Sequence, residues 1–204
     1  MDRMLGFEPR GVGSIPAGPA IVLFKYIMHN QELLNNYFAN NWKAGRGGGI
    51  TSPEEISKFI KDDEWVLDVG CGDNPFKKII KNVVGVDPAF DQADVKCTIE
   101  EYIPHRLFDV AICLGSINFG DINTIENQIS KVVSCLKPVS RIYWRLNPGR
   151  HDHNNEECLE VPFFPWTFEI LRSFAEKHNY TQPVEEIDAH ILRPRLYAEW
   201  HRTS

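Results

Sequence analysis

The sequence has no long hydrophobic run, no C-x-x-C pair and no excess of positive charge. Its five cysteines are an odd number, which favours reduced thiols over a disulfide framework. Lys and Arg number 22 against 28 Asp and Glu, and the net charge of -6 disfavours nucleic-acid binding by broad electrostatics. The apolar stretch Ala20–Phe24 is too short to span a membrane. We therefore expect a soluble, cytoplasmic protein without a membrane partner.

The sequence also lacks internal repeats and low-complexity tails, and its 204 residues favour one domain with a small extension. Residues 1–50 are predicted to form an arm that packs on the core or acts as a lid over it. This arm begins with a Gly- and Pro-rich stretch, contains a helix over Gln31–Trp42 and ends in a flexible joint at Gly45–Gly49. Residues 51–204 are predicted to form the main domain.

Short apolar runs alternate with amphipathic stretches through the main domain, which predicts βαβ units and a parallel sheet covered on both faces. A first helix is expected at Ser52, with Glu55 completing a capping box and Ile56, Phe59 and Ile60 forming the buried stripe. The further helices are expected at Pro75–Lys81, Ile122–Leu136 and Trp166–His178. The expected strands are Trp65–Val69, Val83–Val86, Asp94–Cys97, Val110–Leu114, Arg141–Leu146, Val184–Asp188 and Leu196–Trp200.

The last two of these strands are joined by a loop too short for a crossover helix, so they are expected to form an antiparallel hairpin. The sequence therefore predicts an α/β protein. Its fold is a three-layer Rossmann-like sandwich, with a mostly parallel seven-stranded sheet that ends in this hairpin.

The segment Val66–Gly72 (VLDVGCG) reads as a strand followed by a sharp glycine turn, where a ligand can lie against the backbone. Asp87 ends the next strand, at the sheet edge where open α/β folds bind ligands, and its carboxylate can accept both hydroxyls of a ribose. A dinucleotide fingerprint would have a third glycine where Pro75 stands. In addition, Asp68 would repel a pyrophosphate, whereas it suits the ammonium and sulfonium of S-adenosylmethionine.

Together these segments resemble the class I (Rossmann-like) S-adenosylmethionine-dependent methyltransferases. Val66–Gly72 is similar to that family's first motif, Asp87 to its second, and Phe108–Ser116 to its fourth strand; the terminal hairpin is similar to its reversed seventh strand. The resemblance covers roughly residues 52–203. It implies S-adenosyl-L-methionine as cofactor, held by Asp68 at the methionine amine and Asp87 at the ribose. The other cofactor-binding residues implied are Gly70, Cys71, Gly72, Thr98, Ile99, Leu114, Gly115 and Ser116.

The motifs of nucleic-acid base methylation are absent. The segment Gly115–Gly120 lacks an Asn/Asp-Pro-Pro-aromatic motif, Asn147–Gly149 lacks the second proline, and no cysteine follows a proline as a cytosine-C5 nucleophile would. The acceptor is therefore expected to offer an oxygen or nitrogen on a small molecule, a sugar or a protein.

A polar segment, Arg145–Glu157, follows the fifth strand and contains the candidate catalytic residues His151, Asp152 and His153. Either histidine could serve as a general base, because a histidine side chain can titrate near neutral pH. The same residues with Glu156 could hold a metal, or the segment could be a solvated loop. The aromatic residues beside it either form the wall of an acceptor pocket or cover the core: Asn118 and Phe119 on one side, Phe163, Phe164 and Trp166 on the other.

Two alternatives to a methyltransferase are open at this point. One is a non-catalytic module that keeps the fold and binds S-adenosylmethionine or another partner. The other is a nicotinamide oxidoreductase, which Pro75 and Asp68 disfavour. The acceptor and the oligomeric state are not specified by these motifs.

Overall fold

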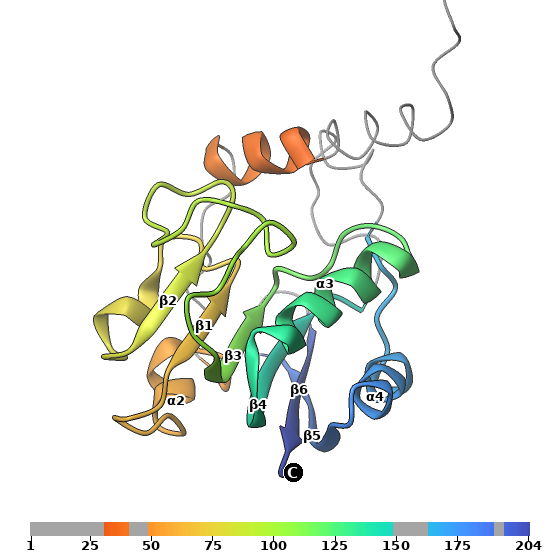
Figure 1. The fold of residues 1–204 in the computed structure, drawn as a ribbon. Helices are drawn as coiled ribbons and strands as arrows, with labels where there is room; N and C mark the ends of the chain where they lie inside the picture. The colour runs from red at the N-terminus through yellow and green to blue at the C-terminus, as the bar shows by residue number, and fades with distance from the viewer. Residues whose placement is uncertain (1–30, 41–48, 149–162, 190–193) are drawn as a thin grey trace, which may run out of the picture.

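The short apolar runs of the sequence pair into a single sheet in the computed structural model, which describes residues 31–40, 49–148, 163–189 and 194–204 (Figure 1). The sheet has six strands in the order β2-β1-β3-β4-β6-β5. Their bounds are β1 Val66–Val69, β2 Val83–Val86, β3 Phe108–Leu114, β4 Leu136–Leu146, β5 Thr181–Asp188 and β6 Arg195–Arg202. The neighbours β2, β1, β3 and β4 run parallel, whereas β6 is antiparallel to both β4 and β5. The α/β class and the terminal hairpin are thus confirmed.

The predicted count of seven strands is wrong, because Asp94–Cys97 forms only an isolated parallel bridge between Val95 and Val86. Val95 donates to Gly85 O at 3.1 Å and accepts from Asp87 N at 3.2 Å. The Asp94 carboxylate accepts a hydrogen bond from Gly85 N at 2.8 Å. This backbone N–H would otherwise donate to the neighbouring strand if the pairing continued. The pairing therefore stops after one residue.

Two amphipathic helices cover one face of the sheet (Figure 1). Helix α3 (Ile122–Ser134) is capped by Asp121, whose carboxylate accepts from Thr124 N at 2.8 Å. Helix α4 (Phe168–Lys177) is capped in the same way by Thr167. Both helices bury an apolar stripe against Leu67, Val69 and the apolar side chains of β3 and β4 on the same face.

The opposite face carries a smaller layer made of α2 (Pro53–Ser57) and the 3-10 helix η1 (Pro75–Lys78). Ser52 caps α2 as predicted, but the reciprocal half of the capping box is not formed, because Ser52 N donates to Gly49 O and Glu55 pairs with Lys58. The helix ends after five residues: Ile56 is buried and Ile60 packs partly buried against the same cluster, but Phe59, predicted to share the buried stripe, is 58% exposed. The predicted helix over Pro75–Lys81 is likewise only a single 3-10 turn.

Residues 31–40 form a helix above the carboxyl ends of the parallel strands (Figure 1). Leu34 packs in one cluster with Phe119 and Phe163, and the rings of Phe38 and Phe119 lie 5.8 Å apart edge to face. The helix over residues 31–40 therefore packs against Phe119 and Phe163, beside the end of β3. Nowhere in the described ranges is a helix long and apolar enough to cross a lipid bilayer.

Candidate functional site

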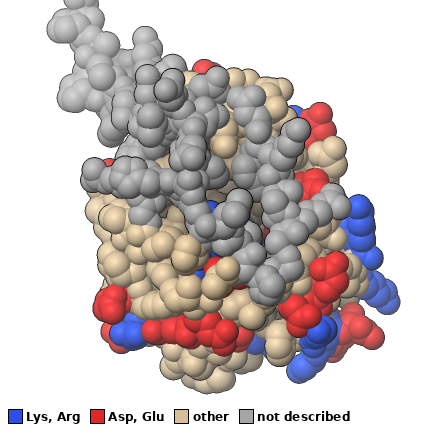
Figure 2. All heavy atoms as spheres, turned by 180° about the vertical axis from the view of Figure 1, so that it is seen from behind, with Lys and Arg blue, Asp and Glu red and all other residues tan. Residues whose placement is uncertain are grey.

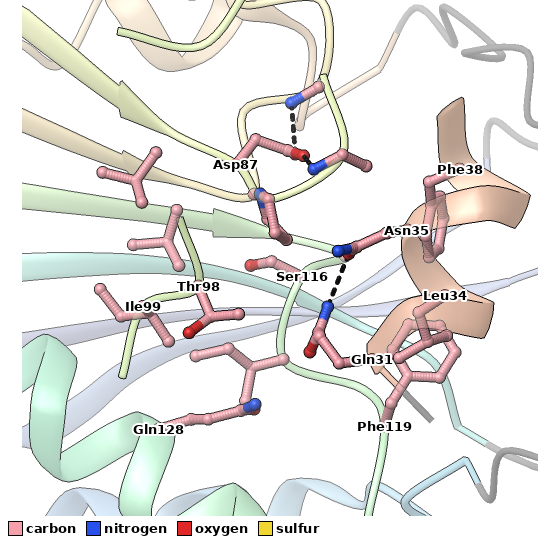
Figure 3. Close-up of a pocket in the computed structure, with 18 of the residues that line it drawn as sticks. Gln31, Leu34, Asn35, Phe38, Asp87, Thr98, Ile99, Ser116, Phe119 and Gln128 are labelled. Carbon is pink, nitrogen blue, oxygen red and sulfur yellow. Dashed lines mark hydrogen bonds between the residues drawn. The ribbon is translucent and has the colours of Figure 1, made fainter. Parts of the chain in front are cut away.

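A cavity of about 280 Å³ lies along the carboxyl edge of the sheet, beneath the helix over residues 31–40 (Figure 3). It runs across β2, β1, β3, β4 and β6, each of which contributes at least one residue to its wall. Four steps of about 4.8 Å between neighbouring strands make this a span of roughly 19 Å. The site is therefore an elongated groove along several strand ends, as expected for open α/β sheets.

Eight of the ten residues predicted to bind the cofactor line this cavity: Gly70, Gly72, Asp87, Thr98, Ile99, Leu114, Gly115 and Ser116. Asp68 and Cys71 do not line it, and both are buried. Eight of the predicted cofactor-binding residues thus lie together in one cavity wall, and their binding to the cofactor stays a prediction.

The turn after β1 needs a glycine at position 70. Gly70 has a φ of +68°, and a Cβ built on it would lie 2.3 Å from Cβ of Ser116, in the loop after β3. The Gly70 N–H donates to Val86 O at 2.7 Å, which ties the turn to the end of β2. The backbones after β1 and β3 therefore approach each other closely, and together they form the floor of the cavity.

The Asp87 carboxylate joins the turn after β1 to the turn after β2 through hydrogen bonds (Figure 3). Its Oδ2 accepts from Gly72 N at 2.9 Å, while its Oδ1 accepts from Ala89 N at 2.8 Å and Phe90 N at 3.1 Å. A carboxylate has about four acceptor positions, so three backbone amides leave room for roughly one further donor. Asp87 therefore organises the turn and has capacity for about one additional hydrogen bond, and its contact with the ribose stays a prediction.

Asp68 is a buried carboxylate next to the glycine turn, and its pKa is strongly raised. It lies on the same face of β1 as Val66, it is 3% exposed, and its Oδ2 has no hydrogen-bond partner. Burial, followed by the nearby charges of Asp87 and Asp94, raises its pKa to about 8. A cation brought close to Asp68 would stabilise the charged carboxylate and lower this pKa again.

At the β2 end of the cavity, polar groups surround Thr98 and Ile99. Gln128 on α3 donates from Nε2 to Glu100 Oε1 at 2.7 Å, and its own Oε1 is buried without a partner. Further along the cavity the Ser116 hydroxyl is also buried without a partner. Both residues line the cavity, so these two atoms are available to a ligand.

The Asn118 side chain fixes the loop that follows β3. Its Oδ1 accepts from Asn147 N at 2.9 Å, and its carbonyl accepts from Phe164 N at 2.8 Å. Phe119 lines the cavity, with Phe163 packed against it at 4.6 Å between ring centroids. Phe164 and Trp166 are buried in the main core, so the core interpretation holds for them.

The candidate catalytic residues His151, Asp152 and His153 lie outside the described residues, as does Glu156. Arg145 and Asn147, which begin the same polar segment, do line the cavity. Across the described ranges, no group of three or more His, Cys, Asp or Glu side chains is arranged to hold a metal ion.

Sequence reasoning missed several lining residues, namely Gln31, Asn35, Gln128 and Arg195. Gln31 and Asn35 project from the helix into the cavity and are joined by a hydrogen bond of 2.7 Å (Figure 3). They come from the segment that was expected to be an arm or lid, and only its amphipathic pattern pointed toward the domain.

Comparison with known proteins supports the same fold. No family model matches the chain. An uncharacterized protein of Methanocaldococcus jannaschii is 30% identical over 96 residues, which cover 41% of this chain and 38% of that protein. The chain thus matches well under half of that relative's length.

Solved structures match over nearly the whole chain. The 1,6-didemethyltoxoflavin-N1-methyltransferase of Burkholderia thailandensis, with bound S-adenosylhomocysteine, has a TM-score of 0.70 at 14% identity and covers 95% of this chain and 94% of its own. The N-methyltransferase NodS of Bradyrhizobium japonicum, also with S-adenosylhomocysteine, has a TM-score of 0.64 at 15% identity, covering 86% and 98%. Magnesium protoporphyrin IX methyltransferase of Synechocystis, with bound S-adenosylmethionine, has a TM-score of 0.57 at 12% identity, covering 94% and 100%.

This chain has the Rossmann-like fold of class I S-adenosylmethionine-dependent methyltransferases.

Proposed function

We propose that this chain is an S-adenosylmethionine-dependent methyltransferase that acts on an oxygen or nitrogen acceptor of a small molecule, a sugar or a protein. The observation that carries the proposal is the Gly70 turn, which packs against Ser116 beside Asp87 in a cavity at the carboxyl edge of the sheet. Similar folds hold S-adenosylmethionine or S-adenosylhomocysteine in the solved structures above.

The residues of the cavity fit this cofactor. The missing side chain at Gly70 leaves backbone surface for a ligand, and the lone Ser116 hydroxyl and Gln128 Oε1 can each accept a hydrogen bond from it. Asp87 lines the cavity, and Asp68 and Asp94 lie close enough to interact with it electrostatically, so this cluster of acidic residues favours a ligand with cationic groups. When bound, S-adenosylmethionine supplies a methyl group that its positively charged sulfur has already activated.

The contribution of the protein is then mainly to position the donor and the acceptor. Correct alignment of two reactants can lower a barrier by roughly 7–11 kcal/mol. Gly70, Ser116 and Asp87 would orient the donor, while Phe119 and Leu34 exclude water from the opposite wall. No histidine lines the described part of the cavity. If the acceptor must lose a proton, His151 or His153 remain the candidate bases.

The polarity of the surface is consistent with an acceptor other than a nucleic acid. On the face seen in Figure 2, acidic and basic side chains are interspersed, and the described residues form no broad positive patch there. Together with the net charge of -6, this favours a small or proteinaceous acceptor.

Calorimetric titration of the full chain with S-adenosylhomocysteine tests the proposal, with NADH as the control ligand. We expect one-site binding of S-adenosylhomocysteine and none of NADH. Conversion of S-adenosylmethionine to S-adenosylhomocysteine in the presence of acceptor mixtures would then separate an enzyme from a non-catalytic binding module. A folded protein that binds NADH, or neither ligand, would overturn the proposal.

A further inference from the structure

The two ends of the cavity differ in charge. The acidic residues in the described wall are Asp87, directly after β2, and Glu100, which accepts a hydrogen bond from Gln128 on α3; the basic ones are Arg145 on β4 and Arg195 on β6. The sheet order β2-β1-β3-β4-β6 places Asp87 and the two arginines at opposite ends of the groove. The cavity is therefore acidic at one end and basic at the other.

The strand register brings the two arginines together. Arg145 pairs with Tyr197 across the antiparallel β4–β6 ladder, and Arg195 lies two residues before Tyr197 on β6. Residues two apart on a strand share a face, so Arg145 and Arg195 are diagonal neighbours on one face of the sheet. Such neighbours lie about 7–8 Å apart, within reach of two long side chains that meet the same ligand. Both are only half-buried and both line the cavity.

Both arginines present guanidinium groups with several donors at the cavity wall. Asp188 lies directly opposite Arg195 on β5 and accepts a hydrogen bond from Thr51 at 2.6 Å. A guanidinium group has five N–H donors, so contacts within the protein leave others for a ligand. Asn147, Gln31 and Asn35 add uncharged polar groups to the same cavity.

We propose that the methyl acceptor carries an oxyanion, either a carboxylate or a phosphate, which Arg145 and Arg195 hold at the β4–β6 end of the cavity. This rests on the proposed function, in which the donor occupies the part of the groove between β2 and β3. Two guanidinium groups favour planar or tetrahedral oxyanions because each can form paired charge-assisted hydrogen bonds. The anion anchors the acceptor and so fixes which of its atoms faces the methyl group.

Small anions serve as probes while the acceptor is unidentified. The full chain is titrated calorimetrically at constant ionic strength with inorganic phosphate and, separately, with succinate, each with and without saturating S-adenosylhomocysteine. The variants are Arg145→Met and Arg195→Met. The matched control is Arg172→Met, which removes the same charge from an exposed ion pair with Glu185 on α4. Arg145→Lys and Arg195→Lys serve if the Met variants do not fold.

We expect at least one anion to bind the wild-type chain, with a tenfold or greater loss in each Met variant and no change in Arg172→Met. The affinity for S-adenosylhomocysteine should change less than threefold. The anion that binds more tightly indicates whether the acceptor carries a carboxylate or a phosphate. Phosphate binding that survives in the Lys variants would favour a phosphate, since lysine binds phosphate as a point charge.

Three results would overturn the inference. The first is no anion binding in either ligand state, and the second is binding that falls equally in the Arg172→Met control. The third is a tenfold loss of affinity for S-adenosylhomocysteine in the arginine variants when no anion is present to compete. That result would assign the arginines to the carboxylate of the cofactor. Failure of the proposed function looks different: the anion binds through both arginines, but S-adenosylhomocysteine does not bind at all.

Discussion

Two buried carboxylates lie at the ends of neighbouring strands, and their hydrogen bonding is opposite. Asp87 after β2 accepts from three backbone amides, at Gly72, Ala89 and Phe90. Asp68 in β1 leaves Oδ2 without a partner, and burial raises its pKa to about 8. The comparison shows that one acidic residue builds the turn, whereas burial favours the uncharged form of the other, and a nearby cation would shift it toward the carboxylate.

The Gly70 turn connects the two carboxylates, and Gly70→Ala should have the largest effect. The new Cβ would lie 2.3 Å from Ser116 Cβ, on a backbone with φ of +68°. We expect binding of S-adenosylhomocysteine to be lost, with a fall of about 3 kcal/mol in unfolding free energy from strain and overpacking. Calorimetry and urea unfolding measure the two effects.

Gly115→Ala is the matched control for this variant. Gly115 has a φ of +98°, but a Cβ there would meet nothing within 4 Å, so the substitution introduces backbone strain without the clash. Because Gly115 itself lines the cavity, the two variants are compared by stability alone. Equal losses of unfolding free energy would show that backbone strain, and not the clash with Ser116, is the cost of Gly70→Ala.

Asp87→Ala tests the structural half of the comparison. Removing the carboxylate leaves three backbone N–H groups without their acceptor, and we expect a loss of roughly 3 kcal/mol in unfolding free energy, since water recovers part of the bonding. Affinity for S-adenosylhomocysteine should fall by roughly 1–3 kcal/mol as well. Asp91→Ala, whose side chain is 86% exposed, is the control. Unchanged stability would mean that Asp87 does not hold the turn.

Asp68→Asn tests the other side of the comparison, the raised pKa of the buried Asp68 side chain. The folded-state pKa of Asp68 is about 8, above the unfolded value of about 3.9, so its contribution to stability is complete at low pH and declines as pH rises through this window. The Asn variant lacks this decline, so its stability relative to wild type should grow as pH rises from about 4 to about 8. Denaturant unfolding across this range measures the difference.

A parallel pH dependence of the two proteins would show that Asp68 titrates normally. Asp91→Asn is the control, because it removes an exposed carboxylate and should leave the wild-type profile unchanged.

Phe38→Ala should have the smallest effect, because it changes only the roof of the cavity. The ring lines the cavity and meets Phe119 edge to face, a contact of about 1 kcal/mol. We expect a three- to tenfold loss of affinity for S-adenosylhomocysteine by calorimetry, with little change in stability. Asn40→Ala, on an exposed part of the same helix, should leave affinity unchanged; an equal loss there would indicate a general effect on the helix.

Much of the fold could be predicted because local signals agree with the tertiary structure. Asp121 and Thr167 cap their helices as their residue types suggest, and the apolar runs of β1 and β3 are buried on both faces. The segment Asp94–Cys97 was mispredicted because its strand-like pattern does not reveal that the Asp94 side chain takes the Gly85 N–H.

The site was predictable where one segment encodes it and unpredictable where distant segments meet. The Val66–Gly72 turn and Asp87 carry their chemistry in local sequence. Convergence of Arg145 and Arg195 depends on the β4–β6 register, and no local pattern specifies that register. The Asp87 hydrogen bonds to Ala89 and Phe90 similarly depend on the path of the backbone after β2.

Electron density from crystals grown with S-adenosylhomocysteine would test the central claim most directly. We predict density for the nucleoside between Asp87 and Ile99, with the homocysteine arm running along Gly115 and Ser116 toward β4. Well-ordered crystals with an empty groove, or with the ligand bound elsewhere on the molecule, would contradict it.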